Sequence, residues 1–92
     1  MVVRRVISVR GRVQGVGFRY FAVGEARRLD LNGTVANLPD GSVEAVVEGN
    51  EEIVKAFIDR LREGPPASKV TGLGVRDEKP RGDLHGFEIR FR

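Results

Sequence analysis

The chain has 92 residues, and we expect residues 1–92 to form a single domain with a modest core. A hydrophobic share of 40% and a charged share of 32% exclude a disordered tail. No apolar run approaches the roughly 20 residues that a membrane-spanning helix needs. The sequence contains no cysteine and one histidine, His85, so disulfides, thiolate metal sites and cysteine nucleophiles are excluded. These features predict a cytoplasmic protein without membrane contacts.

The chain carries a formal net charge of +3, and 13 of its 16 basic residues are arginine. A planar guanidinium is suited to bidentate recognition of phosphate or carboxylate groups. The charge balance therefore indicates a phosphorylated partner, either a nucleic acid or a small molecule. A heat-adapted or GC-rich genome would give the same balance, so composition alone does not decide between these explanations.

Hydrophobic periodicity and turn signals predict the elements of the first third of the chain. Residues 2–10 are rich in β-branched side chains, which favours a strand, and the three glycines within residues 11–17 predict a tightly bent loop. From Phe18 the apolar spacing becomes helical, and Asn32-Gly33 is a turn signal that ends this helix. The apolar face of the helix consists of Phe18, Phe21, Ala22, Ala26 and Leu29.

The rest of the chain adds a hairpin, a second helix and two further strands. Residues 34–38 and 42–48 predict the two strands of the hairpin, because Pro39-Asp40-Gly41 between them has the composition of a tight turn. Asn50 is placed to cap the second helix, which Gly64-Pro65-Pro66 ends. The remaining strand candidates are residues 70–77 and 86–91.

The predicted order is βαββαβ, with the last region split into two pairing segments. Because crossover connections are right-handed, this order predicts an α+β, ferredoxin-like sandwich. Such a fold has an antiparallel sheet with both helices on one face. The glycine-rich loop and the start of the first helix then lie at one end of the sheet, beside the second strand.

The glycine-rich loop is a candidate anion site, because it leads from a strand directly into a helix N-terminus. Gly15 and Gly17 allow successive amides to turn inward with no side chain in the way. The spacing does not fit the nucleotide P-loop, since Val16-Gly17 stands where glycine and lysine would be required after Gly11. It does not fit the dinucleotide fingerprint either, because Tyr20 replaces a glycine. An ordinary strand-to-helix connection is the alternative.

Arg19 strengthens the anion-site interpretation. It lies in the first turn of the predicted helix, where the dipole repels a cation by about 0.3–1 kcal/mol at a surface site. An anion between the loop amides and the guanidinium would account for this placement. The alternative is an arginine whose stem covers apolar surface while its head reaches solvent.

The other polar candidates carry less information. Asn37 lies within a predicted strand, where asparagine is depleted, and its residue type alone favours a role at the edge of the following turn. His85 is expected to be an exposed or hydrogen-bonded side chain and not a base, and the carboxylates form no convincing acid/base pair. Phe18, Phe21 and Phe57 are expected to belong to the core and not to a base-stacking platform.

Two segments of this sequence resemble the signatures of a known family. Residues 9–19, VRGRVQGVGFR, resemble the first signature of the acylphosphatases. Residues 33–37, GTVAN, followed by Gly41-Ser42-Val43 and Gly49, resemble the second. One departure is Thr34, where the family usually has an aromatic residue. Chain length and element order also fit, so the resemblance covers essentially the whole chain.

The resemblance implies a function and the residues that perform it. It implies metal-independent hydrolysis of acyl phosphates to a carboxylate and inorganic phosphate, without a cofactor. In this scheme Arg19 binds the phosphoryl group and Asn37 orients the attacking water. The backbone amides that cradle the phosphoryl oxygens are those of Gln14, Gly15, Val16, Gly17 and Phe18. The partners are a small-molecule acyl phosphate, and inorganic phosphate or sulfate as product or inhibitor, with a monomeric protein.

The chemistry of the residues agrees with this implication. The leaving carboxylate needs no general acid, and phosphoryl transfer is mostly positioning and charge stabilisation. An RNA-binding module shares the predicted topology, but Gln14, Val16 and Arg19 depart from its octapeptide, which would also lie within the third strand. We therefore expect no nucleic acid partner. A ligand-sensing regulatory domain, or an acylphosphatase-like domain acting on carbamoyl phosphate, is the remaining alternative.

Overall fold

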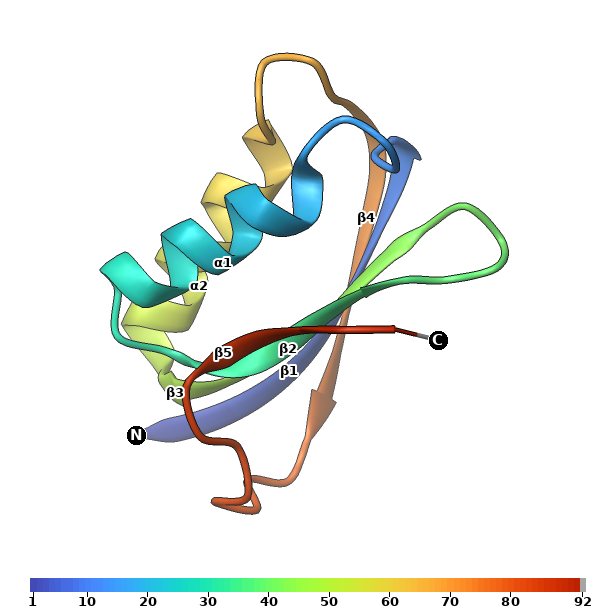
Figure 1. The fold of residues 1–92 in the computed structure, drawn as a ribbon. Coiled ribbons are helices and arrows are strands. Elements are labelled where there is room, and N and C mark those ends of the chain that lie inside the picture. Colours follow the sequence, from blue (N-terminus) through green and yellow to red (C-terminus); the bar gives the residue numbers. More distant parts are fainter. Residues whose placement is uncertain (92) are drawn as a thin grey trace.

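A computed structural model describes residues 1–91 of the chain as a five-stranded sheet covered on one face by two helices (Figure 1). The elements in chain order are β1 (Val2–Arg12), α1 (Phe18–Arg28), β2 (Asn32–Asn37), β3 (Val43–Asn50), α2 (Glu51–Glu63), β4 (Lys69–Glu78) and β5 (Phe87–Arg90). The order of strands across the sheet is β4-β1-β3-β2-β5. The predicted α+β, ferredoxin-like fold is confirmed. No helix in the described part of the chain is long and apolar enough to cross a membrane.

The predicted antiparallel arrangement holds for four strands, and the fifth differs. β4, β1, β3 and β2 pair antiparallel, whereas β5 pairs parallel to β2, with Gly33 opposite Phe87. The chain leaves β4 at the end of the sheet where β2 begins, and residues 79–86 carry it across to β5 at that same end (Figure 1). β5 therefore runs in the same direction as β2.

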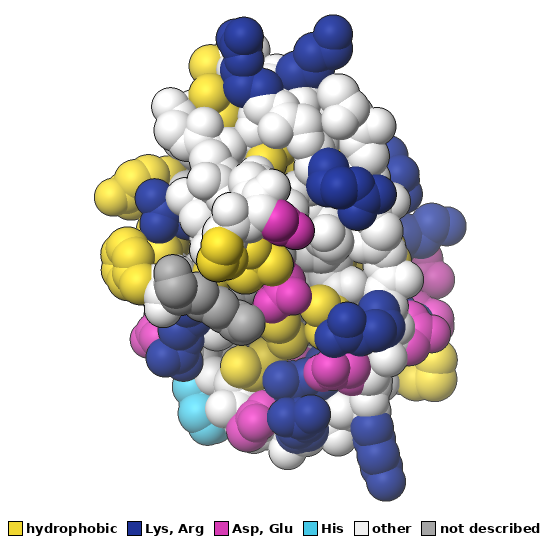
Figure 2. Space-filling model, turned by 90° about the vertical axis from the view of Figure 1, so that its right-hand side faces the viewer, with side chains coloured by type: hydrophobic (Ala, Val, Ile, Leu, Met, Phe, Trp, Pro, Cys, Tyr) yellow, Lys and Arg dark blue, Asp and Glu magenta, His cyan; other side chains and the backbone are white. Residues whose placement is uncertain are grey.

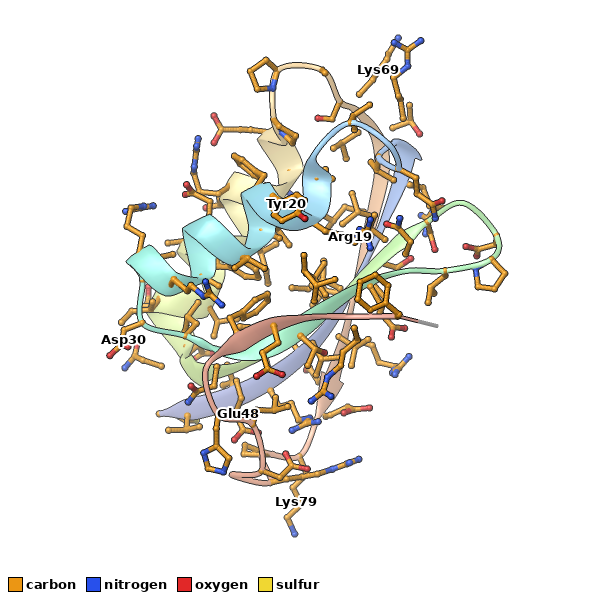
Figure 3. All side chains as sticks on the ribbon, in the orientation of Figure 1. Arg19, Tyr20, Asp30, Glu48, Lys69 and Lys79 are labelled. Carbon is orange, nitrogen blue, oxygen red and sulfur yellow. The ribbon has the colours of Figure 1, made fainter. Side chains whose placement is uncertain are left out.

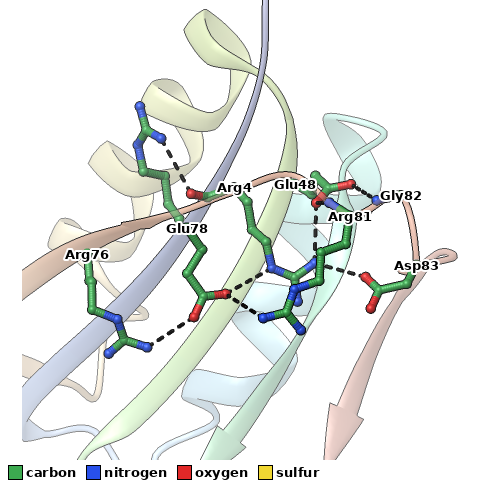
Figure 4. Close-up of polar contacts among 8 residues, drawn as sticks. Arg4, Glu48, Arg76, Glu78, Arg81, Gly82 and Asp83 are labelled. Carbon is green, nitrogen blue, oxygen red and sulfur yellow. Dashed lines mark hydrogen bonds and ion pairs between the residues drawn. The ribbon is translucent and has the colours of Figure 1, made fainter.

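An arginine on the open face of the sheet holds this crossing segment (Figure 4). Arg4 of β1 is 6% exposed, and its guanidinium pairs with Glu48 at 3.2 Å, Glu78 at 3.1 Å and Asp83 at 2.9 Å. Glu48 also accepts the backbone amides of Arg81 and Gly82, at 3.0 and 2.8 Å. These contacts fix the segment that leads into β5.

The core lies between the sheet and the helices, as the alternation of apolar residues predicts. Val43, Ala45 and Val47 of β3 are all buried against the helices. Phe57 of α2 contacts Phe87 of β5, with ring centroids 5.5 Å apart. The largest fully buried side chains are Phe18, Phe57, Phe87, Ile7, Leu61, Val9, Val13, Val35, Val43, Val47 and Val54.

The turn after α1 lies earlier than the sequence indicates. Asn32 and Gly33, which predict a turn, belong to β2, and the chain reverses at Asp30, whose φ of 57° is left-handed. A side chain at Gly33 would collide with the Val46 carbonyl oxygen and the Phe87 ring. This glycine therefore serves close packing between strands.

Candidate active site

The glycine-rich loop adopts the conformation that an anion cradle requires. Gly15 and Gly17 have φ angles of 74° and 81°, in the left-handed region that glycine enters without strain. A Cβ at either position would meet no atom within 4 Å, so backbone conformation explains these glycines and crowding does not. The buried side chains of Val13 and Phe18 anchor the two ends of the loop in the core.

The amides of this loop have no acceptor in the described part of the chain. None of the amides from Gln14 to Phe18 donates a hydrogen bond to another group of residues 1–91. Gly17, the N-cap of α1, provides no capping side chain, and the first turn contains no acidic residue. These donors and the positive end of the helix dipole are therefore available to an anion.

Arg19 extends from the first turn of α1 toward the end of the sheet (Figure 3). The side chain is half-buried, and no carboxylate of residues 1–91 pairs with its guanidinium. Its neighbour is the ring of Phe91, whose centroid lies 5.7 Å from Arg19 Cζ. A ring attracts the cation without accepting the strong hydrogen bonds that a carboxylate would accept. The N–H groups of Arg19 therefore stay available for a ligand.

Asn37 is the last residue of β2 and faces the loop from the neighbouring hairpin. It lies on the same face of the sheet as the buried Val35, and its Oδ1 is buried without a hydrogen-bond partner among the described residues. A buried polar atom without a partner is costly, since such groups are almost always satisfied. Asn37 Oδ1 thus requires a hydrogen-bond donor from outside the described residues, such as a water molecule.

These features meet in one pocket of about 200 Å³. It is lined by Val13, Gly15, Gly17, Phe18, Arg19, Tyr20 and Asn37. The structure thus brings together both predicted catalytic side chains and three of the five predicted cradle residues, whereas Gln14 and Val16 do not line this pocket. A larger hollow of about 290 Å³, beside α2 and β4, contains none of these residues.

The surroundings of the pocket are basic. Arg12 and Lys69 are exposed register partners where β1 ends and β4 begins, at the same end of the sheet as the loop. Figure 2 shows Lys and Arg side chains projecting at the top of that view, with acidic side chains mainly lower down. The positive charge at this end favours the approach of an anion.

Three contacts at this site were not predicted from the sequence. The side-chain amide of Gln14 donates to the carbonyl oxygens of Leu38 and Ser42. Tyr20 is 76% exposed and lines the pocket, and Phe91 lies against Arg19. The alternation of Phe87, Ile89 and Phe91 is the one signal that places Phe91 on the helix-covered face.

His85 is exposed in the segment before β5, as expected. Residues 1–91 contain no group of three or more acidic or histidine side chains that could hold a metal ion.

The fold and the pocket define a small α+β protein with a candidate anion site at one end of its sheet. The acylphosphatase family model matches residues 5–89, and the chain therefore belongs to the acylphosphatase family. An acylphosphatase from Anaeromyxobacter dehalogenans is 54% identical over 97% of this chain and 96% of that protein.

Solved structures give the same result. The crystal structure of acylphosphatase from Bacillus subtilis matches with a TM-score of 0.90 and 43% identity, over 98% of this chain and 99% of that one. A much longer protein, HypF from T. kodakarensis, matches with a TM-score of 0.84 and 37% identity, over 96% of this chain and 12% of that one. The fold therefore occurs both as a small protein and within a larger chain.

Proposed function

We propose that this protein hydrolyses the carboxyl–phosphate bond of acyl phosphates, and that Arg19, Asn37 and the amides of residues 14–18 perform the reaction. One observation carries the proposal. Unpaired loop amides, an arginine without a carboxylate partner and the unpartnered Asn37 Oδ1 all adjoin one pocket. Donors that line one pocket fit a phosphoryl group, and the lone acceptor beside them fits a water.

The cradle and Arg19 bind and stabilise the phosphoryl group. In phosphoryl transfer the negative charge spreads over three equatorial oxygens, and catalysis is mostly positioning and electrostatic stabilisation. The amides of the loop and the N-terminus of α1 surround these oxygens from one side. The Arg19 guanidinium contributes a planar set of donors that can bridge two of them.

Asn37 positions the nucleophile. Its Oδ1 accepts a hydrogen bond from a water and aims the water oxygen at phosphorus. The new bond forms between this oxygen and phosphorus, while the bond from phosphorus to the acyl oxygen breaks and the carboxylate leaves. The proton of the water passes to a phosphoryl oxygen of the substrate. The leaving carboxylate needs no general acid, which agrees with the absence of an acid/base pair among the lining residues.

The same pocket supports the further properties that we propose for this protein. Inorganic phosphate and sulfate fit the cradle and act as product and inhibitor. The protein acts as a monomer without metal or cofactor, because every group that the scheme uses lies in this one chain. An RNA-binding role has less support, since Phe18 and Phe57 are 1% and 0% exposed and cannot stack on bases.

A paired hydrolysis assay tests the proposal. A small aromatic acyl phosphate and an aryl phosphate monoester are compared, each with and without a chelator. We expect hydrolysis of the acyl phosphate only, unchanged by the chelator, because the monoester has a far poorer leaving group. Loss of activity with the chelator and recovery with a divalent cation would refute the metal-independent scheme. Preferential turnover of carbamoyl phosphate would favour the alternative substrate.

A further inference from the structure

The side chain of Gln14 ties the phosphate loop to the hairpin that carries Asn37. Its Nε2 donates to the carbonyl oxygen of Leu38 at 2.8 Å and to that of Ser42 at 2.9 Å. Both hydrogens of the amide are therefore used. Leu38 directly follows Asn37, and Ser42 directly precedes Val43, the register partner of Asn37. Gln14 thus holds the two ends of the turn next to the water-orienting residue.

The turn does not need Gln14 to close. The Leu38 amide donates to the Ser42 carbonyl at 2.9 Å, and the Gly41 amide donates to the Leu38 carbonyl at 3.1 Å. The Asp40 carboxylate accepts from the amide and the hydroxyl of Ser42, at 2.9 and 2.6 Å. Because the turn is satisfied internally, the two Gln14 hydrogen bonds set the position of the turn relative to the loop.

We infer that the Gln14 side chain is a positioning residue that fixes Asn37 relative to the phosphate cradle. This inference rests on the proposed function. The cradle amides belong to residues 14–18, and Asn37 belongs to a separate strand, so the in-line geometry of water and phosphoryl group depends on a link between the two. Gln14 is the first residue of the cradle, and its side chain provides that link. A displacement of about 1 Å in such a constellation can lower a rate by about 10²-fold.

The test uses Gln14→Met, which keeps the length of the side chain and removes both donors. We expect kcat to fall about ten- to hundredfold while KM and the Kd for inorganic phosphate change less than about threefold. In an Asn37→Ala background the same substitution should lower kcat less than about threefold further, because the group that Gln14 positions is already absent. An equal loss in both backgrounds, or a higher KM at unchanged kcat, would overturn the inference.

Two further variants separate this role from a general effect on folding. Asn32→Ala is the matched control: Asn32 Oδ1 accepts the Gly86 amide at 2.9 Å at the opposite end of β2, so kcat should stay unchanged. Gln14→Glu presents no donor when ionised and one O–H donor when protonated. Its kcat relative to wild type should rise as the pH falls toward the ordinary carboxyl pKa of about 4.3. A ratio that stays flat with pH would contradict the inference even if Gln14→Met does not fold.

The wild-type enzyme and Asn37→Ala distinguish this inference from the proposed function. If wild type does not hydrolyse the acyl phosphate, or Asn37→Ala keeps its full kcat, the proposed function fails. If wild type is active and Asn37→Ala is impaired, but Gln14→Met retains wild-type kcat, only the positioning role of Gln14 fails.

Discussion

Replacing Arg4 by methionine should destabilise the fold far more than replacing its neighbour Arg5. Arg4→Met keeps most of the apolar stem and leaves the carboxylates of Glu48, Glu78 and Asp83 without their shared cation (Figure 4). The side chains of Arg4 and Glu48 are 7% and 10% exposed. Breaking a buried ion pair by removing one partner costs about 3–5 kcal/mol. The lower end applies here, because the Asp83 side chain is 53% exposed and water reaches that side of the network.

A loss of about 3 kcal/mol corresponds to a fall in Tm of about 12–24 °C for a domain of this size. Arg5 forms two ion pairs as well, but its partners Asp77 and Glu51 are 77% and 47% exposed. Arg5→Met should therefore lower Tm by only a small fraction of that amount, since exposed ion pairs contribute little. Thermal unfolding followed by circular dichroism measures both variants. Equal Tm values for the two would refute the reasoning.

The pH dependence of this difference provides a second check. The Arg81 amide, followed by the Gly82 amide and Arg4, lowers the pKa of Glu48 below its ordinary value of 4.5. Hydrogen bonds from Arg4 lower the pKa of Glu78 and the pKa of Asp83. Carboxylates with lowered pKa values stabilise the fold above the ordinary pKa, and this stabilisation is lost as the pH falls through the folded-state value. The gap in stability between wild type and Arg4→Met should thus be constant above about pH 5 and shrink below pH 4.5. A gap that is the same at pH 7 and pH 3 would refute the electrostatic origin.

Three further predictions concern the pocket. Arg19→Lys should lower kcat about 10²–10³-fold, nearly as much as Arg19→Ala, because lysine lacks the planar set of donors of a guanidinium. A lysine variant that keeps most of its kcat would show that positive charge alone is sufficient for stabilisation of the phosphoryl group. Inorganic phosphate should stabilise the protein by about 2.7 kcal/mol at a hundredfold excess over its Kd, measured by calorimetry. Arg19→Ala should lose the part of this stabilisation that saturates with phosphate concentration. An equal saturable shift in that variant would place the anion elsewhere. Phe91→Leu should raise KM about two- to fivefold at unchanged Tm, because the ring is 86% exposed and orients Arg19, while Phe91→Trp should retain the wild-type KM. Identical KM values in the leucine and tryptophan variants would contradict this role.

Local rules were sufficient to predict most elements of this fold. The alternation of Val43, Ala45 and Val47 matches the buried face of β3, and Asn50 is the predicted cap of α2. The Asn50 side chain indeed accepts the Glu52 amide at 3.0 Å, and Gly64 ends the helix with a φ of 70°. These features depend on residues close in sequence, which explains why the pattern revealed them.

The features that the sequence did not reveal depend on distant contacts. The parallel pairing of β5 depends on the path of residues 79–86 across the sheet, and this segment is held by Arg4 and Glu48, which lie 44 positions apart. Gly33 resembles a turn residue in its local context, and only the packing of Phe87 against it explains its place in a strand. At the site, the loop and Arg19 stand out because a helix N-terminus favours an anion and disfavours a cation, whereas the proposed role of Asn37 rests on the family resemblance. The contacts of Gln14 and Phe91 exist only after the hairpin and β5 have docked.

The two helices show how the site differs from the rest of the fold. α2 begins with two features that stabilise a helix start: Asn50 caps it, and Glu51 and Glu52 complement the dipole. α1 begins with a glycine, has no capping side chain and no acidic first turn, and carries Arg19 where the dipole disfavours a cation. The same end of the molecule holds the unpaired loop amides and the buried Oδ1 of Asn37. Each of these features is unfavourable in the free protein, and a bound phosphoryl group with its water would relieve all of them at once. The ion pairs of Arg4 with its carboxylates add stability at the opposite end of β1, while the pocket retains the unpaired donors and the acceptor that we propose for the reaction.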